Sequence, residues 1–218
     1  MITLSSLHNV LVGGLIGAAV LTTVSFRLRA MLRAYALSAI CLALLSVSVG
    51  LRQGLEDPFA FAVATMLLKV IAIPAFLYSL ARHTGAPLRL QSFVRAATTL
   101  FVAGLLGAIT FFVSSRTASY VPSSIPPSFL TIAIYLILLG FTMMILRRDI
   151  LSQMIGFLTL ENGISMISVI TVGSLPLFIE VGVFSAVAMS TIVMSHLFRR
   201  IQEAYGAPDS SLLRELVE

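Results

Sequence analysis

Residues 152–172 read SQMIGFLTLENGISMISVITV, an apolar stretch with a carboxylate, Glu161, near its middle. A helix of this length can cross the hydrocarbon core of a bilayer, which takes about 20 residues. An ionisable residue in hydrocarbon is costly and usually faces a protein interior or a water-filled path. Glu161 is therefore the first candidate functional residue, and the stretch predicts an integral membrane protein.

The composition extends this prediction to the whole chain. Of the 218 residues, 58% are hydrophobic and 11% are charged, and the mean hydropathy is +1.04. Soluble domains carry about 25% charged residues, so an ordinary soluble protein is excluded. The net charge of +5 comes from arginines clustered between apolar runs, which is typical of topology signals and not of nucleic-acid binding. We expect an all-α, polytopic membrane protein that contacts the lipid bilayer and no nucleic acid.

Seven stretches have the length and apolar character of transmembrane helices. They are expected at residues 8–26, 35–51, 58–81, 94–112, 128–146, 152–172 and 176–198.

The distribution of arginines predicts an orientation with the N-terminus outside and the C-terminus in the cytoplasm. Arg52 and Arg116 fall in outer loops of this topology. The inner loops and the tail hold Arg27, Arg29, Arg33, Arg82, Arg89, Arg95, Arg147, Arg148, Arg199, Arg200 and Arg214. Cytoplasmic loops of membrane proteins carry this excess of basic residues.

A segment rich in serine and proline divides the chain. Residues 114–128 read SSRTASYVPSSIPPS, and because proline lacks an amide donor we expect an irregular linker there. The predicted parts are a four-helix N-terminal part at 1–113, an external linker at 114–127, a three-helix part at 128–200 and a cytoplasmic tail at 201–218.

No motif for a metal, cofactor or nucleophile is apparent in the sequence. Cys41 is a lone cysteine in an apolar run, and the three histidines His8, His83 and His196 lack ligand spacing. We therefore expect no bound cofactor, no metal and no catalytic residue.

Lys69 is the second candidate functional residue. It lies about 16 Å from the outer end of its predicted helix, near the middle of the membrane and too deep to reach either surface comfortably. Pro74 follows five residues later and leaves the Val70 carbonyl without its helical partner, which adds polar character beside the amine. A buried amine suits proton transfer. The alternative is a static ion pair with Glu161 or with a partner subunit.

Glu161 lies about 13 Å from the inner end of its helix, at a depth similar to that of Lys69. A buried carboxyl can take up and release protons, whereas the alternative is a permanently protonated acid in an interhelical hydrogen bond. Glu180, near the outer end of the last predicted helix, is a further candidate or simply reaches the interface. His196 lies near the inner mouth and either feeds protons to the path or is merely solvated.

Two polar or small-residue features predict helix packing only. Asn162 follows Glu161 and is expected to point elsewhere, as a hydrogen bonder between helices. The glycine pairs Gly13 with Gly17 and Gly104 with Gly107 are expected to allow close helix approach.

Several motifs resemble a known family. Residues 147–169, RRDILSQMIGFLTLENGISMISV, are similar to the second helix of the K subunit of respiratory complex I. Lys69-Val70 with Pro74, ENG at 161–163, LPLFIEVGV at 175–183 and the tail sequence DSSLLREL resemble hydrogenase-4 component E, a membrane subunit of group 4 [NiFe] hydrogenase complexes. The pattern of complex I has its first glutamate where this chain has Leu158. Component E often has an aspartate where this chain has Ala186.

The resemblance implies a membrane subunit placed between antiporter-like subunits and the membrane anchor of a redox module, in the cytoplasmic (inner) membrane of a bacterium or archaeon. It would be a non-catalytic subunit of an oxidoreductase complex that contributes Glu161, Lys69, Glu180 and His196 to a proton or sodium path. Because Ala186 replaces an acid, we expect Glu161 to pair with Lys69 or with a neighbouring subunit. The alternatives are a structural spacer without ion transfer, and an autonomous secondary transporter, for which an internal repeat is missing.

Overall fold

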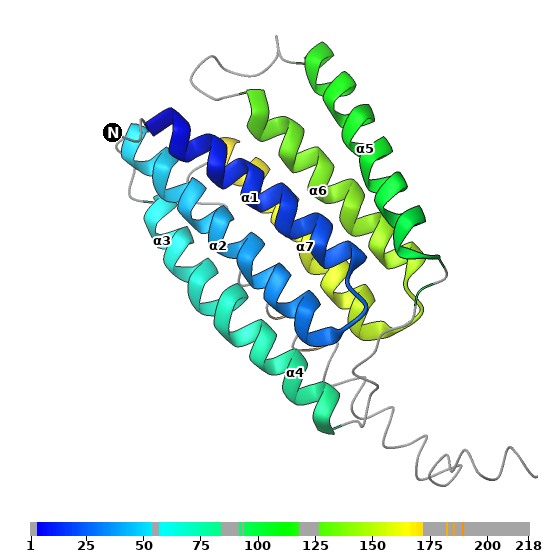
Figure 1. Ribbon diagram of the computed structural model, residues 1–218. Coiled ribbons are helices and arrows are strands. Elements are labelled where there is room, and N and C mark those ends of the chain that lie inside the picture. Colours follow the sequence, from blue (N-terminus) through cyan, green and yellow to red (C-terminus); the bar gives the residue numbers. More distant parts are fainter. Residues whose placement is uncertain are drawn as a thin grey trace, which may run out of the picture.

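The computed structural model is a helical bundle and describes residues 4–53, 57–83, 92, 94–117 and 127–171, together with 182, 185 and 189. Helix α1 spans Leu4–Val24 and α2 spans Leu28–Gln53. The next rod consists of α3 (Asp57–Thr65), a π-helical segment η1 (Met66–Ala72) and α4 (Ile73–His83), which follow one another without a break. Helices α5 (Ala96–Thr117), α6 (Pro127–Leu146) and α7 (Ile150–Thr171) complete the described part (Figure 1).

Five of the described helical rods are long and apolar enough to cross a membrane. These spans are Leu28–Leu51, Pro58–Arg82, Ala96–Arg116, Ser128–Leu146 and Ile150–Ile167, and a shorter apolar helix covers His8–Val24. The prediction of an all-helical membrane protein is thereby confirmed for the described residues. The seventh predicted helix, 176–198, and the tail 201–218 lie outside the described residues apart from three isolated positions.

Helix ends follow local chemistry at several points. Pro127 begins α6, at a position where its missing N–H costs no hydrogen bond. The Asp149 carboxylate accepts a hydrogen bond of 2.8 Å from the Ser152 amide and so caps the start of α7.

Two helices are longer than predicted. Helix α2 begins at Leu28 instead of residue 35, so the arginines of the first inner loop lie partly on its first turns. Helix α5 continues to Thr117, four residues into the predicted linker. Serine fits there because the Ser115 hydroxyl donates to the Phe112 carbonyl at 2.7 Å within the helix.

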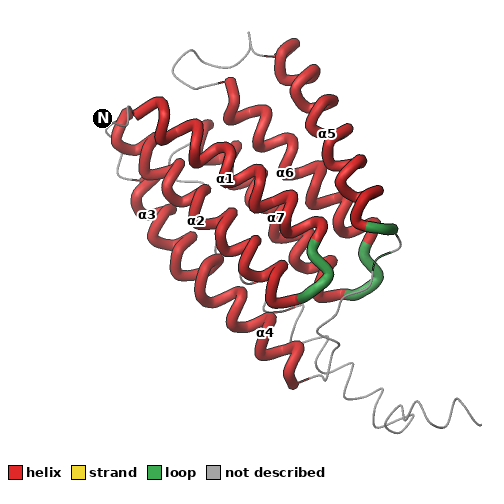
Figure 2. The backbone as a smooth tube through the Cα atoms, in the orientation of Figure 1, coloured by secondary structure: helices red, strands yellow, loops and turns green. Residues whose placement is uncertain are grey.

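The closest helix packing joins α6 and α7 through glycines that the sequence motifs did not single out. A Cβ on Gly140 would lie 2.5 Å from the Leu160 amide nitrogen, and one on Gly163 would lie 2.6 Å from the Ala133 carbonyl oxygen. The backbones therefore approach at distances that only glycine permits. Figure 2 shows the two helices running side by side within the bundle.

Gly13, Gly17 and Gly104 are not used for packing against the helices that the structure describes. Among the described residues, a Cβ at any of these three positions would meet nothing within 4 Å, and one at Gly107 would be in ordinary contact distance of Tyr135. In α1 the close neighbour is instead Gly14, where a Cβ would lie 3.1 Å from the Cys41 sulfur of α2. The motif has the right spacing, but its face points away from the described helices.

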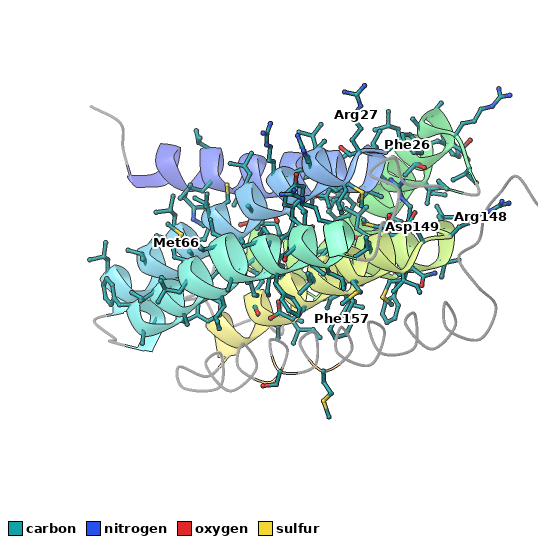
Figure 3. All side chains as sticks on the ribbon, turned by 90° about the horizontal axis from the view of Figure 1, so that it is seen from below. Phe26, Arg27, Met66, Arg148, Asp149 and Phe157 are labelled. Carbon is teal, nitrogen blue, oxygen red and sulfur yellow. The ribbon has the colours of Figure 1, made fainter. Side chains whose placement is uncertain are left out.

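Arginine-bearing ends of the helices gather at one end of the bundle. Figure 3 shows Phe26, Arg27, Arg148 and Asp149 close to that end. The loop after α1 and the turn between α6 and α7 therefore lie on the same side, as the predicted topology requires. Which side of the membrane this end faces stays a prediction.

One of these arginines, Arg147, lies in the turn between α6 and α7, where a loop was predicted, and also has a structural role. Arg147 is only 3% exposed, and its guanidinium donates to the carbonyls of Thr23 at 2.5 Å and Ser25 at 2.6 Å. It also lies over the Phe26 ring at 4.9 Å. Burial lowers the pKa of this guanidinium, and the nearby Asp149 carboxylate opposes that shift. Arg147 thus ties the end of α1 to the turn between α6 and α7.

Candidate functional site

A buried ion pair between Lys69 and Glu161 forms the centre of the site. The Lys69 ammonium of η1 lies 2.5 Å from Glu161 Oε2 of α7. Both side chains are sealed from solvent, at 0% and 1% exposure. The pair is 92 positions apart in the sequence and is brought together by the packing of the α3–η1–α4 rod near α7. The expected pairing of Glu161 with Lys69 within this chain is therefore observed.

The ammonium has further oxygen neighbours on α7. It donates to Asn162 Oδ1 at 3.0 Å and to Ser165 Oγ at 3.2 Å. The Ser165 hydroxyl in turn donates to Glu161 Oε1 at 2.5 Å. Serine and glutamate lie four residues apart, one helical turn, so both face the lysine. The Glu161 carboxylate thus contacts the Lys69 ammonium directly through Oε2, and indirectly through Oε1, which accepts a hydrogen bond from the Ser165 hydroxyl.

Asn162 extends the network to a third helix. Its Nδ2 donates to Ser38 Oγ of α2 at 3.3 Å, and the Ser38 hydroxyl donates to the Tyr35 carbonyl at 2.7 Å. The amide therefore presents its oxygen to Lys69 and its nitrogen to α2. The prediction that Asn162 joins helices is confirmed, but the prediction that it points away from Glu161's surroundings is wrong. A lysine reaching across α7 contacts both consecutive residues.

The lysine is carried on an irregular helical turn. In η1 the Ile73 amide bonds to the Leu68 carbonyl, five residues back, instead of the usual four. Pro74 follows directly and lacks the amide that would bond to Val70. Single π-helical turns occur frequently at functional sites. The helix around Lys69, just before Pro74, is therefore a widened turn.

Apolar clusters enclose the polar network on both sides. One cluster includes Leu42, Phe61 and Met166, and the other includes Tyr35, Ile73 and Leu158. On α2, on the α3–η1–α4 rod and on α7, the polar residues fall in sequence between members of the two clusters. The ion pair therefore lies in a polar layer with hydrocarbon-like packing above and below. Charges held there pay a desolvation cost of several kcal/mol each, which good pairing offsets.

Two serines of the polar network were not predicted from the sequence: Ser165, which contacts the ion pair, and Ser38, which contacts Asn162. Ser165 had a signal, because residues at i and i+4 share a helix face and it follows Glu161 by four. Ser38 had none, since a serine in an apolar helix most often bonds to its own backbone. Several other buried hydroxyls do so, among them Thr22 with the Ala18 carbonyl at 2.8 Å.

The remaining predicted site residues are not placed. Glu180 and His196 lie outside the described residues, as does position 186. Among the residues that are described, no group of three or more His, Cys, Asp or Glu side chains is positioned to hold a metal ion.

The arrangement has a definite chemical capability. Moving one proton from the Lys69 ammonium to the Glu161 carboxylate converts an ion pair into two neutral groups without moving any heavy atom far. Low polarity around the pair reduces the free-energy difference between these two forms, because burial penalises charge. A nearby charge can therefore shift the pair between its ionic form and its neutral form, which hold the same number of protons.

Comparison with known proteins gives distant relatives. The chain is 29% identical to an uncharacterized protein of Mycobacterium tuberculosis over 212 residues, covering 94% of this chain and 93% of the relative. It is 23% identical over 182 residues to hydrogenase-4 component E of Escherichia coli K12, covering 84% of each chain. The same similarity holds for hydrogenase-4 component E of Shigella flexneri. No family model matches, and no solved structure matches.

The comparisons and the fold agree on a coarse description. A relationship over most of both chains connects this protein to a component of a hydrogenase, and its apolar helices make it a multi-pass membrane protein. The matched share includes most of the chain, so the similarity is not confined to one helix.

Proposed function

We propose that this chain is an integral membrane subunit of a complex I-like assembly of the hydrogenase type, in the cytoplasmic membrane of a bacterium or archaeon. It contributes buried charges to an ion path, while other subunits carry the redox centres. Its neighbours are antiporter-like membrane subunits and the membrane anchor of the redox module. The similarity to hydrogenase-4 component E supports the assembly, and the Lys69–Glu161 pair supports the ion path.

The single observation that supports the proposal is the buried ion pair of Lys69 and Glu161, whose residues lie on two helical spans long and apolar enough to cross a membrane. Among the described spans, Glu161 is the acid within the apolar interior, and Lys69 is the one lysine of the chain. A helix bundle gains little net stability from a buried ion pair relative to apolar residues of similar size. A role in proton transfer would explain why the chain nevertheless contains a buried Lys69–Glu161 pair.

Coupling follows from electrostatics. A charge arriving beside the pair, on a neighbouring subunit after a redox step, favours either the ion pair or the neutral pair. Ion pairs in low-polarity surroundings respond over longer distances than pairs in water, because screening by solvent and salt is absent. Glu180 and His196 are the proposed outer and inner continuations of the path.

The experiment compares the wild-type complex with Glu161→Gln in membrane vesicles. In Glu161→Gln we expect electron transfer to or from hydrogen to start as in wild type. Proton uptake should fall about tenfold or more, because glutamine keeps the shape of glutamate but cannot take up the proton. Purification in mild detergent, with identification of co-purifying subunits, checks that the variant still assembles. Assembled Glu161→Gln complex that pumps at the wild-type rate would refute the ion-path role.

A structural spacer is the second candidate, and one observation favours it: each Glu161 oxygen already has a partner inside the chain. It predicts that Lys69→Met combined with Glu161→Leu assembles and couples normally. The ion-path proposal predicts assembly without coupling for the same double variant. Measuring subunit content and proton uptake on one preparation separates the two.

A further inference from the structure

The Lys69 ammonium sits among oxygen atoms of three chemical kinds. Glu161 Oε2 lies at 2.5 Å, Asn162 Oδ1 at 3.0 Å and Ser165 Oγ at 3.2 Å. A carboxylate, an amide carbonyl and a hydroxyl are hard oxygen donors, the kinds that bind hard metal cations. The positive charge at their centre is supplied by the protein's own side chain.

We infer that the Lys69 ammonium is a tethered cation in a position that a sodium ion would otherwise occupy, so that this site passes protons and excludes sodium. The exclusion of sodium from transport rests on the proposed function, whereas the tethered-cation arrangement does not. Of the two ions left open by the sequence, the structure assigns the proton.

Charge balance supports the exclusion. The Lys69–Glu161 pair is neutral as a whole, and the described membrane spans place no second carboxylate in the apolar interior. A sodium ion entering beside the ammonium would add an uncompensated charge to a buried site, which is strongly unfavourable. A proton taken up by the pair brings the same charge, but it binds covalently to the Glu161 carboxylate that is already present and needs no added volume and no set of coordinating oxygens.

The attachment of the lysine prevents simple displacement. Its backbone is held in η1, and its side chain is fully buried between the two apolar clusters. A free cation can leave a site by diffusion, but a tethered ammonium remains at high effective concentration. Sodium would therefore have to displace the Lys69 ammonium from these oxygens, and the ammonium cannot dissociate from the chain.

The test removes the tethered cation and asks whether sodium replaces it. Lys69→Ala leaves the carboxylate, amide and hydroxyl around an open space. Adding NaCl should raise the thermal midpoint of the purified complex carrying Lys69→Ala by roughly 2–4 °C relative to choline chloride. Wild type should show no sodium-specific shift. Two matched controls should also show none: Lys69→Met, which fills the space, and Lys69→Ala with Glu161→Gln, which lacks the charge.

A sodium-specific shift in wild type, or none in a folded Lys69→Ala complex, would overturn the inference. If Lys69→Ala does not assemble, wild-type vesicles decide. Radioactive sodium uptake driven by electron transfer and abolished by Glu161→Gln overturns it. Proton uptake that is equal in sodium and choline buffers, with no such sodium uptake, supports it. Proton uptake insensitive to Glu161→Gln would instead refute the proposed ion path and leave the cation-binding result to stand.

Discussion

Among single residues, the two serines of the network differ in whether their hydrogen-bond partners are charged. Ser165 bonds to a charged amine and a charged carboxylate, whereas Ser38 bonds to an amide and a backbone carbonyl. Hydrogen bonds to charged groups contribute about 1.5–3 kcal/mol, and neutral ones about 0.5–1.5 kcal/mol.

This difference predicts that Ser165→Ala destabilises the protein more than Ser38→Ala does. We expect losses of about 2 kcal/mol and about 1 kcal/mol in the free energy of unfolding. Denaturant titration of the purified protein in mixed micelles measures both. The two substitutions remove the same single oxygen from buried helix positions, so each serves as the control for the other. Equal losses would mean that Ser165 does not serve the charged pair.

At the scale of helices, glycine position decides where two backbones can meet. The pair of α6 and α7 depends on Gly140, Gly156 and Gly163, and their nearest neighbours are largely backbone atoms that cannot move alone. The spacing of small residues in α1 resembles a packing motif, but none of the described helices packs against it. A motif of small residues therefore shows where a close approach of two helices is possible. Whether it occurs depends on which helix lies beside it.

Gly140→Ala should destabilise the bundle by about 1–3 kcal/mol, the usual cost of overpacking a close contact. Its added Cβ would lie 2.5 Å from the Leu160 nitrogen, so α6 and α7 would have to separate. Gly13→Ala adds the same atom to an apolar helix at a position where no described residue lies within 4 Å, and it should cost nothing measurable. Thermal unfolding of the two variants provides the comparison. A harmless Gly140→Ala would contradict the close approach of α6 and α7.

The widened turn around Lys69 shows how one residue changes an element. A proline cannot donate a hydrogen bond to the carbonyl four positions back. Here the Ile73 amide, just before Pro74, bonds to the Leu68 carbonyl five positions back. A proline in an apolar helix predicts an irregularity but not its form. The widened turn carries Lys69, which faces Glu161 of α7.

At the scale of the whole molecule, Arg147 connects segments that are distant in sequence. Its contacts with Thr23 and Ser25 close the end of the bundle where α1, α6 and α7 meet. A buried guanidinium that satisfies backbone carbonyls is difficult to replace, because removal leaves those carbonyls unpaired.

Arg147→Met should lower the free energy of unfolding by about 3 kcal/mol, since two bonds from a charged donor are lost. Arg27→Met, at the same end of the bundle but exposed, should change it by less than about 0.5 kcal/mol. Unfolding curves of the two variants in one detergent test this difference. Similar losses for both would indicate that net charge at this end, and not the buried contacts, sets the stability.

The predicted linker at 114–127 does not separate two independent sites. The candidate site takes Lys69 and Ser38 from the N-terminal side and Glu161 from the C-terminal side. The two predicted parts therefore share one polar layer. The linker separates them along the chain, whereas the bundle packs them together.

The membrane class, the approximate positions of the described spans and the two ionisable residues within them could be predicted from the amino-acid pattern alone. This is possible because the cost of exposing polar groups to hydrocarbon acts on each segment independently. The packing of the helices establishes that Lys69 pairs with Glu161 inside this chain and that Arg147 is buried. It also brings Asn162, Ser165 and Ser38 into one network. These features depend on which helix faces meet, and that choice follows from packing between segments distant in the chain, which local patterns do not encode.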